Sequence, residues 1–430
     1  MSVQTGANRP EQSDEHTDHA KGAPTIAIVG AGPAGLMAAE AVAAAGLKVQ
    51  IFDHMPAPGR KFLMAGRGGL NLTHSEPLPD FLSRYGPANT PLPAIVESFP
   101  PEALRAWAED LGQPTFIGTS GKVFPQALKA SPLLRAWLQR LASLGVELHL
   151  RHRWRGWDEA NRLILARPEA EDLHIPADAT ILALGGASWP RLGSDGTWVE
   201  TLARAGVAVT PIEPFNAGVC IAWSKHLVSG FAGQPLKRIA LRYAGRAVRG
   251  EAIVTRTGLE GGCIYALNEL IREGLSSSTA PVLNLDLRPD LNHHQLTERL
   301  SAPRGRQSMA TFLRRKTGLT AAAIALAREP DGKLPEDPRE LAAHLKDIKL
   351  KVTGLSALDR AISTSGGVAW AALDENMMLR DRPGVFCAGE MLDWHAPTGG
   401  YLLQGVFASA ITASHGVLSW LGQASPAKTK

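Results

Sequence analysis

The feature that most constrains this chain is the stretch TIAIVGAGPAGLMAAEAVAAAGLKVQIFD at residues 25–53. An apolar, β-branched run leads into the pattern G-x-G-x-x-G, with glycines at Gly30, Gly32 and Gly35. An alanine-rich segment follows, and then a second apolar run that ends in Asp53. Strand, glycine turn, helix, strand and acid in this order are typical of a dinucleotide-binding βαβ unit. The stretch therefore predicts an α/β fold built on a parallel sheet.

Each part of this unit has a physical task. The first glycine permits a tight turn, the second lets the main chain approach a pyrophosphate, and the third lets the helix lie close to the sheet. The N–H groups at the start of the helix then face the phosphates. Asp53 is expected to accept hydrogen bonds from ribose hydroxyls, and its charge disfavours a 2′-phosphate, so FAD or NAD is preferred to NADP. The predicted contacts of the turn are Gly30, Ala31, Gly32, Ala34 and Gly35.

The next segment, PGRKFLMAGRGGLNLTHSE at 58–76, favours FAD over NAD. An NAD domain usually continues into another regular βα unit, whereas this chain inserts a glycine-rich loop that can wrap a longer cofactor. Arg60 and Lys61 suit phosphate or flavin-edge contacts, and Asn71 and Thr73 suit ribityl hydroxyls or ring carbonyls. Arg67 lies in the same loop. The other interpretation of this segment is a flexible, basic surface loop.

The sequence GEMLDWHAPTGGYLLQGVFASA at 389–410 predicts the other half of the site. It follows an apolar run, so a buried strand is expected to end at Gly389 and Glu390, whose carboxylate can accept hydrogen bonds from a ribityl chain. A helix that opens at Gly399 and Gly400 can direct free N–H groups at the flavin pyrimidine edge, where negative charge develops on reduction. Leu403, in the first turn of that helix, completes the predicted cofactor set.

The totals of residue types restrict the function further. A length of 430 residues favours two or more domains, and a net charge of +4 gives no strong case for nucleic acid or a charged membrane surface. Basic clusters at 151–157 and 312–318 are interpreted as solvated surface rather than phosphate contacts, because no stacking or groove-reading motif accompanies them. The three cysteines are far apart and form no C-x-x-C, which indicates free thiols in a reducing compartment. The histidines show no ligand spacing, so no metal is expected.

The ends of the chain and its long apolar runs bear on location. Residues 1–23 are polar and contain no apolar core of the kind a secretory signal needs, so we interpret them as a disordered tail. No membrane-spanning segment is expected, because each long run is taken to be broken by a charge or another interruption. The protein is therefore predicted to be cytoplasmic and to have no membrane partner.

Five motifs, in their order and spacing, resemble those of the YhiN/BaiN-like FAD-dependent flavoproteins, often called the aminoacetone oxidase family. They are GAGPAG at 30–35, GRKFLMAGRGGLNLTHSE at 59–76, ALGGASWPRLGSDG at 183–196, TSGGV at 364–368 and AGEMLDWHAPTGGYLLQ at 388–404. The resemblance spans nearly all of the chain after residue 24. It implies a glutathione-reductase-type Rossmann FAD domain interrupted by an inserted β-barrel and helices, and an oxidoreductase whose donor is NAD(P)H or an organic substrate. One departure is GRGGLN at 66–71, where many members read GGGRCN, so roles of that arginine and cysteine do not carry over.

The organisation of the rest agrees with an insertion. The expected division is a tail at 1–23, the first part of the FAD domain at 24–212, an inserted substrate domain at 213–351 and the second part of the FAD domain at 352–430. The insert mixes strand-like runs at 218–223, 237–243 and 281–287 with helical stretches at 265–272, 307–316 and 338–345. It contains no second G-x-G-x-x-G, so NAD(P)H is expected to visit the flavin without a Rossmann unit of its own. The substrate is expected between insert and cofactor domain.

These observations predict an FAD-dependent oxidoreductase that transfers a hydride between flavin and a small organic substrate or NAD(P)H. No catalytic residue is assigned. His395, beside Asp393, is the first candidate for proton transfer, although a purely structural histidine is the other interpretation, and His74 and Tyr265 are weaker candidates. Two alternatives stay open: an NAD-dependent dehydrogenase that uses the same fingerprint, and a non-catalytic flavin-binding or sensor protein.

Overall fold

The βαβ unit forms where the sequence predicts it. In the computed structural model, which describes residues 23–65, 68–86, 90–277, 280–329 and 332–423, β1 (Thr25–Val29) and β2 (Lys48–Asp53) pair in parallel and α1 (Pro33–Ala44) connects them. Ile26 and Ile28 of β1 are fully buried, as expected for a central strand covered on both faces. The tail predicted at 1–23 lies, apart from residue 23, outside the described residues.

Remote segments complete the parallel sheet. All neighbouring strands pair in parallel. Their spatial order is β20 (Val385–Cys387), β10 (Ala179–Leu182), β1, β2 and β6 (Glu147–Leu150). The carboxyl ends of β1, β2, β10 and β20 therefore meet at one edge, where α/β sheets commonly bind ligands.

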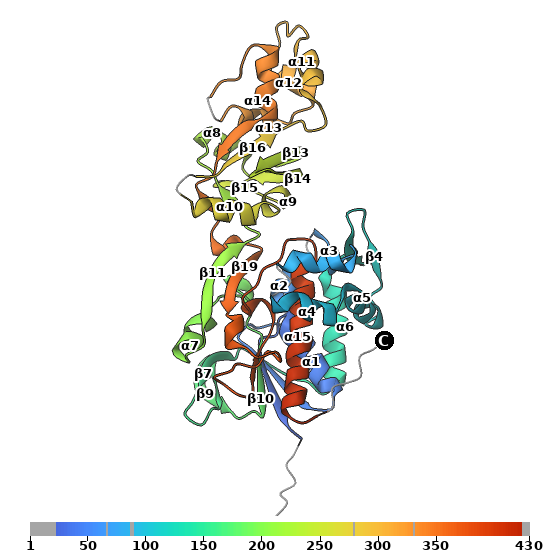
Figure 1. Cartoon of the computed structure of the whole chain (residues 1–430), viewed down its shortest axis with the longest axis vertical. Coiled ribbons are helices and arrows are strands. Elements are labelled where there is room, and N and C mark those ends of the chain that lie inside the picture. The colour runs from blue at the N-terminus through green and yellow to red at the C-terminus, as the bar shows by residue number, and fades with distance from the viewer. Residues whose placement is uncertain (1–22, 66–67, 87–89, 278–279, 330–331, 424–430) are drawn as a thin grey trace, which may run out of the picture.

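The two faces of this sheet are covered differently (Figure 1). Three helices lie on one face: α1, α6 (Ala130–Ser143) and α15 (Tyr401–Trp420), and α1 contacts both of the others. An antiparallel sheet lies on the other face, formed by β7 (Arg153–Trp157), β8 (Leu163–Arg167) and β9 (Ala170–Ile175). These layers make the lower lobe of the molecule.

Smaller elements surround the helical face. A three-stranded antiparallel sheet is formed by β3 (Thr73–His74), β5 (Lys122–Pro125) and β4 (Thr115–Ile117). The other helices of this lobe are α2 (Arg60–Ala65), α3 (Leu78–Leu82), α4 (Pro91–Ser98), α5 (Pro101–Asp110) and α7 (Trp198–Arg204).

Helix α15 corrects one expectation. Among the described residues it is long and apolar enough to cross a membrane, whereas the sequence was expected to contain no such stretch. Its most apolar window is 67% buried inside the protein, where it packs on α1 and α4, so length and composition alone do not make it a membrane span. The cytoplasmic location stays a prediction.

The upper lobe is an antiparallel sheet with helices around it. In spatial order its strands are β17 (Ile348–Lys351), β16 (Val282–Asp286), β13 (Pro235–Tyr243), β14 (Arg246–Val254), β15 (Gly258–Glu260), β12 (Val219–Cys220) and β18 (Gly354–Leu355). No pairing among the described strands joins β17 to β18, so the expected β-barrel has the form of a sheet with two edges. The helices are α8 (Lys225–Phe231), α9 (Gly262–Tyr265), α10 (Asn268–Leu275), α11 (His293–Leu300), α12 (Met309–Thr317), α13 (Ala321–Ala327) and α14 (Pro338–Lys346).

Each lobe has its own hydrophobic core. The buried residues of the upper core all lie between Val219 and Val352, and those of the lower core lie before and after that stretch. Two antiparallel strands, β11 (Val209–Phe215) and β19 (Ser363–Val368), run between the lobes (Figure 1). We therefore propose the predicted division into 24–212, 213–351 and 352–430 as the domain organisation.

Candidate cofactor site

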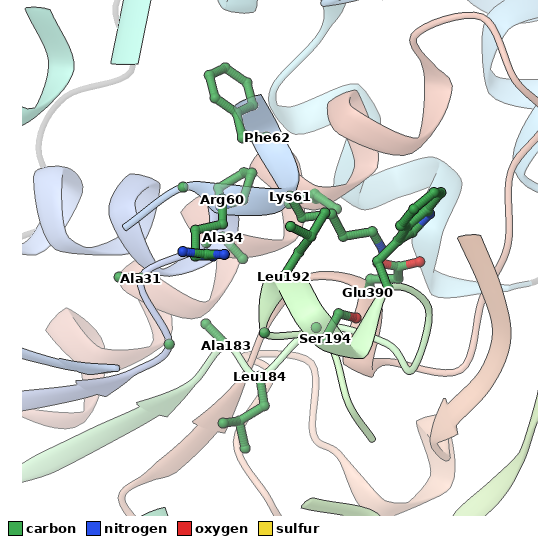
Figure 2. Close-up of a pocket in the computed structure, with 18 of the residues that line it drawn as sticks. Ala31, Ala34, Arg60, Lys61, Phe62, Ala183, Leu184, Leu192, Ser194 and Glu390 are labelled. Atoms are coloured by element: carbon green, nitrogen blue, oxygen red, sulfur yellow. The ribbon is translucent and has the colours of Figure 1, made fainter. Parts of the chain in front are cut away.

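A cavity of about 620 Å³ lies at the carboxyl edge of the parallel sheet. It begins at the glycine turn after β1 and reaches the start of α15 and the strands between the lobes. Figure 2 shows Arg60 and Lys61 of α2 near the turn residues Ala31 and Ala34, with Glu390 beside Lys61. The predicted residues that line the cavity are Gly30, Ala31, Gly32, Ala34, Asp53, Arg60, Lys61, Asn71, Glu390, Gly399, Gly400 and Leu403. The other three, Gly35, Thr73 and Gly389, are not part of its wall.

The three glycines of the turn have different structural roles. Gly30 has φ +110°, and a Cβ there would overlap with the carbonyl oxygen of Ala183, which follows β10. A Cβ on Gly35 would overlap with the carbonyl oxygen of Gly30, so this glycine allows α1 to pack on the turn. Gly32 has an extended backbone, and a Cβ there would meet no protein atom within 4 Å. Because Gly32 lines the cavity, the space beside it is left for a ligand.

The N-terminus of α1 suits an anion. Pro33 occupies the first helical position, no acidic side chain lies in the first turn, and no side chain caps the helix. The N–H groups of a first turn have no acceptor within the helix, and the positive end of the helix dipole adds to their effect. The positive end of α1 therefore lies at the cavity wall with no acidic residue in its own first turn.

Asp53 binds the turn and faces the cavity. Its Oδ2 accepts a hydrogen bond from Ala31 N (2.6 Å) and its Oδ1 accepts one from Met55 N (2.7 Å). Each carboxylate oxygen has a second lone pair, so both oxygens can still accept a bond from a ribose hydroxyl. The carboxylate thus fixes the shape of the turn in addition to its predicted role.

A charged cluster beside Asp53 has no counterpart in the sequence-based prediction. Asp195 accepts a hydrogen bond from Arg153 Nη1 at 2.9 Å, and His54 Nε2 lies 3.8 Å from the same carboxylate. Burial and the neighbouring Arg153 lower the pKa of His54, although Asp53 and Asp195 oppose this shift. All these side chains line the cavity. The charge of Asp195 is thus balanced within the wall, and His54 is held towards its neutral form.

Lys61 and Glu390 were both predicted to contact the cofactor, and they also bond each other. Lys61 Nζ donates to Glu390 Oε2 and to Ser188 Oγ, each at 2.7 Å. Glu390 Oε1 accepts a hydrogen bond from Thr364 N at 3.1 Å, and the Glu390 side chain is only 8% exposed. Four segments that are distant in the sequence are thereby tied together beside the cavity. Arg60 differs, because its Nη2 donates to Arg191 O at 3.5 Å and its Nε is buried without a partner among the described residues.

The start of α15 forms the far end of the cavity. Gly400 is the N-cap residue with φ +103°, and Gly399 has φ +131°. A Cβ on Gly400 would lie 2.6 Å from main-chain atoms of Thr73, so Thr73 packs beneath this glycine instead of lining the cavity. Gly389 is likewise behind the wall, and its N–H donates to Ser409 Oγ of α15.

Polar contacts hold the start of α15 in place. The Tyr401 hydroxyl donates to Glu76 Oε1 at 2.6 Å, and Arg84 donates to both oxygens of the same carboxylate. The Arg84 guanidinium lowers the pKa of Glu76, burial acts in the opposite direction, and Tyr401 adds to the lowering. His74 stacks on Tyr401 with ring centroids 5.5 Å apart. This cluster therefore fixes the first residue of the helix.

The candidates for proton transfer do not line the cavity. His395 packs on Phe215 with ring centroids 4.2 Å apart, and burial followed by the charge of Arg272 lowers its pKa. Burial raises the pKa of Tyr265, in the upper lobe, to about 12. His74 is engaged with Tyr401, as described. Among the described residues no group of histidine, cysteine and acidic side chains is arranged to hold a metal ion.

Two wall residues at the far end were missed by sequence reasoning. The Lys122 ammonium, on β5, has no hydrogen-bond or ion-pair partner among the described residues, and Asn216 is a buried amide between β11 and β12. A single lysine on a short strand and a single asparagine in a loop carry no sequence signal. In the departing motif, Leu70 is fully buried and is not part of the wall, and Arg67 lies outside the described residues.

Comparison with known proteins decides the family. The family described as HI0933-like protein Rossmann domain matches residues 24–416. The chain belongs to this family. It is similar to a 3-dehydro-bile acid delta(4,6)-reductase of Clostridium scindens, with 25% identity over 90% of this chain and 97% of that protein. It is also similar to a ribosomal RNA dihydrouridine synthase of Escherichia coli, with 24% identity over 89% of this chain and 95% of that protein.

A solved structure shows the same fold. The 3-ketosteroid delta1-dehydrogenase of Sterolibacterium denitrificans has a TM-score of 0.52 at 13% identity, and the match covers 92% of this chain and all of that one. Membership of the HI0933-like family confirms the resemblance and the Rossmann fold predicted from the motifs. It also identifies this protein as an FAD-dependent oxidoreductase.

The cavity fits FAD. An extended dinucleotide needs a close main-chain approach at the pyrophosphate, which the open space beside Gly32 provides. It also needs donors and acceptors along its length, and Arg60 Nε and the Oδ1 atoms of Asn71 and Asn216 are buried without a partner in the described part of the chain. All three residues line the cavity.

Proposed function

We propose that this enzyme transfers a hydride between FAD and a small organic substrate, with NAD(P)H as a transient donor that has no Rossmann unit of its own. The proposal depends most on one observation: the described parallel sheet contains one glycine turn followed by a helix at a strand end, and this turn opens into one long cavity. A single nucleotide site filled by FAD leaves NAD(P)H to bind at the exposed end of the flavin. The bile-acid relative is named a reductase, which supports transfer of the hydride from the reduced flavin to the organic substrate.

The protein's part in this reaction is to bind, orient and shield. The N-terminus of α1 and Arg60 would hold the pyrophosphate, Asp53 the adenosine ribose, and the Lys61–Glu390 pair the ribityl chain. The N–H groups at Gly399 and Gly400 would stabilise negative charge on the pyrimidine edge. Bound FAD supplies the hydride acceptor and donor.

We place the substrate at the end of the cavity near the strands between the lobes. Ile362, beside β19, lines the cavity and is 39% exposed. Lys122 provides a cation at the same wall that no described residue neutralises. An apolar surface with one free cation suits an apolar substrate that carries a carbonyl oxygen, because the ammonium can donate a hydrogen bond to that oxygen.

The test is a two-step reduction without oxygen. Protein loaded with FAD is mixed with NADH or NADPH, and bleaching of the flavin absorbance is followed. The reduced enzyme is then offered a panel of α,β-unsaturated ketones, including steroid enones, with their saturated counterparts as matched controls. We expect reoxidation by unsaturated compounds and none by saturated ones. Equal rates with both sets, or no reduction by either nucleotide, would contradict the proposal.

A second candidate is reduction of a base in RNA, and the charge distribution favours it. Residues 213–351 contain 21 lysines and arginines against 14 acidic residues, so the insert alone exceeds the +4 of the whole chain. Its β13 and β14 expose Lys237, Arg242, Arg246 and Arg249, which is the kind of surface that binds phosphate backbones. A relative bears the name ribosomal RNA dihydrouridine synthase. These two observations oppose the expectation, made from the sequence, that the protein has no nucleic acid partner. They do not oppose the expectation of a small-molecule substrate.

Binding at different salt concentrations separates the candidates. If the substrate is a small molecule, we expect this protein to bind ribosomal RNA fragments no more tightly than an unrelated protein of the same net charge does. An RNA-modifying enzyme would bind them with an affinity that falls steeply as salt rises, and the R246E/R249E double variant would weaken the binding further. Reoxidation of the reduced flavin by the RNA, with loss of uridine absorbance, would make this second candidate the function.

A further inference from the structure

Asn216 has an unusual combination of features. It follows β11 directly, its residue is only 1% exposed, and its φ is +50°, a conformation that asparagine tolerates better than most residues. Its Nδ2 donates to Ser363 Oγ and to Ala396 O, each at 2.8 Å. Its Oδ1 is buried and has no partner among the described residues, although the residue lines the cavity.

The orientation of this amide is fixed by its partners. The carbonyl oxygen of Ala396 can only accept a hydrogen bond, so the atom facing it must be the nitrogen. Ser363 Oγ uses its proton on Phe215 O at 3.3 Å and therefore accepts from Asn216 as well. Both protons of the amide nitrogen are thus occupied, and the oxygen is left as an acceptor that cannot turn away. A buried acceptor in this state is costly unless a ligand or a water supplies a donor.

The position in the cavity indicates which part of the cofactor it meets. An extended FAD with its pyrophosphate at Gly32 and its adenosine ribose at Asp53 must place its ring towards the opposite end of the cavity. Asn216 lies at that end and is bonded to Ala396, three residues before Gly399. The same loop therefore holds Asn216 and supplies the glycines at the predicted pyrimidine edge.

The chemistry of that edge leaves one partner. The pyrimidine part of oxidised isoalloxazine presents two carbonyl oxygens and a single N–H between them, at N3. The N–H groups at Gly399 and Gly400 suit the carbonyl oxygens, and an acceptor facing the same edge can pair only with N3–H. We infer that Asn216 Oδ1 accepts a hydrogen bond from N3–H of the flavin. This bond would fix the orientation of the ring within its own plane. This assignment does not depend on which substrate the enzyme uses.

Two other asparagines show what is particular to Asn216. Asn71 also has a buried Oδ1 without a partner, but no described residue bonds its nitrogen, so its amide can turn and serve as a donor. Asn268 is equally buried at 1% exposure, yet its Oδ1 accepts from Ala217 N and its Nδ2 donates to Ala217 O. Asn268 therefore provides a control whose oxygen already has a protein partner and which is not part of the cavity wall.

The experiment compares FAD with 3-methyl-FAD, which lacks the N3 proton. Apoprotein is titrated with each cofactor, and binding is followed by quenching of flavin fluorescence. We expect wild type to bind 3-methyl-FAD about tenfold more weakly or worse, because a hydrogen bond is lost. Asn216→Gly keeps the positive φ, removes the acceptor and should bind both cofactors about equally. Asn268→Gly should keep the wild-type preference.

A second readout excludes a merely steric effect of the methyl group. An acceptor on N3–H disfavours loss of that proton, so the N3 pKa of bound FAD, measured from its absorbance at rising pH, should be higher in wild type than in Asn216→Gly. If Asn216→Gly does not fold, Ser363→Ala, which frees one amide proton without removing Oδ1, should retain the preference for FAD over 3-methyl-FAD. Equal binding of both cofactors by wild type, or an unchanged N3 pKa in Asn216→Gly, would overturn the assignment.

Discussion

Replacement of Gly32 by alanine separates cofactor binding from folding. The backbone of Gly32 is extended, with φ −82° and ψ −178°, and a Cβ there would meet no protein atom within 4 Å. The apoprotein should therefore tolerate the change and gain about 0.4–1 kcal/mol from the smaller freedom of its unfolded chain. The added methyl group points into the space that the pyrophosphate needs, so the cost should appear only when FAD binds.

The size of that cost follows from the contact at risk. A hydrogen bond to a charged group contributes about 1.5–3 kcal/mol, and moving the pyrophosphate away from the main chain loses at least one such bond. At about 1.4 kcal/mol for each factor of ten, FAD should bind about 10- to 150-fold more weakly. Titration of apoprotein with FAD measures the affinity, and thermal unfolding without FAD measures the stability.

Gly35→Ala is the matched control. A Cβ at Gly35 would overlap with the carbonyl oxygen of Gly30, so this variant should destabilise the apoprotein itself by about 3 kcal/mol. The two glycines lie in one turn, yet the first substitution should weaken FAD binding without destabilising the apoprotein, and the second should destabilise the fold itself. Unchanged FAD affinity in Gly32→Ala, or a large loss of apoprotein stability, would refute the assignment of this space to the cofactor.

Three further predictions concern the wall of the cavity and the anchor of α15. Glu390→Gln leaves Lys61 without its ionic partner at 2.7 Å and should lower the unfolding free energy by about 2 kcal/mol, whereas unchanged denaturant unfolding would contradict the role of the pair. The Arg84 guanidinium holds the pKa of Glu76 below its usual 4.5, so the stability contributed by this carboxylate is present above pH 4.5 and is lost as pH falls through the lowered pKa. In Glu76→Gln the unfolding temperature should therefore fall less steeply with decreasing pH in this acid range. In the FAD orientation proposed above, Lys122 lines the ring end of the cavity, so Lys122→Met should lower the midpoint potential of bound FAD by roughly 30 mV, with Lys129→Met as the exposed control. An equal shift in both variants would refute a specific effect of Lys122.

Local signals predicted the parts of the fold that depend on local chemistry. The glycine turn, α1 and Asp53 lie where the pattern places them, because strand, turn and helix are set by neighbouring residues. In the upper lobe the run at 237–243 is β13 and the stretch at 338–345 is α14. The helix expected at 265–272 is instead two short helices that meet between Tyr265 and Asn268. The strand β14, with exposed arginines and a glycine, has no apolar alternation and was not predicted.

The partners of the site residues followed from no local pattern. Lys61 and Glu390 were each expected to face the cofactor, but their mutual ion pair arises because α2 and the end of β20 meet at one sheet edge. Thr73 packs under Gly400 because β3 passes below the start of α15. Lys122 and Asn216 line the cavity through the same kind of long-range approach.

The sequence by itself determined that this chain folds around a dinucleotide, since glycine spacing, apolar runs and a terminal acid act within one βαβ unit. The arrangement of the rest of the cavity was decided only by the tertiary structure. Whether a polar side chain is paired or left free depends on which distant segment the packing brings against it, and residue spacing along the chain does not encode that meeting. Asn216 is the clearest case, because its free oxygen is defined by Ser363 and Ala396, far away along the chain.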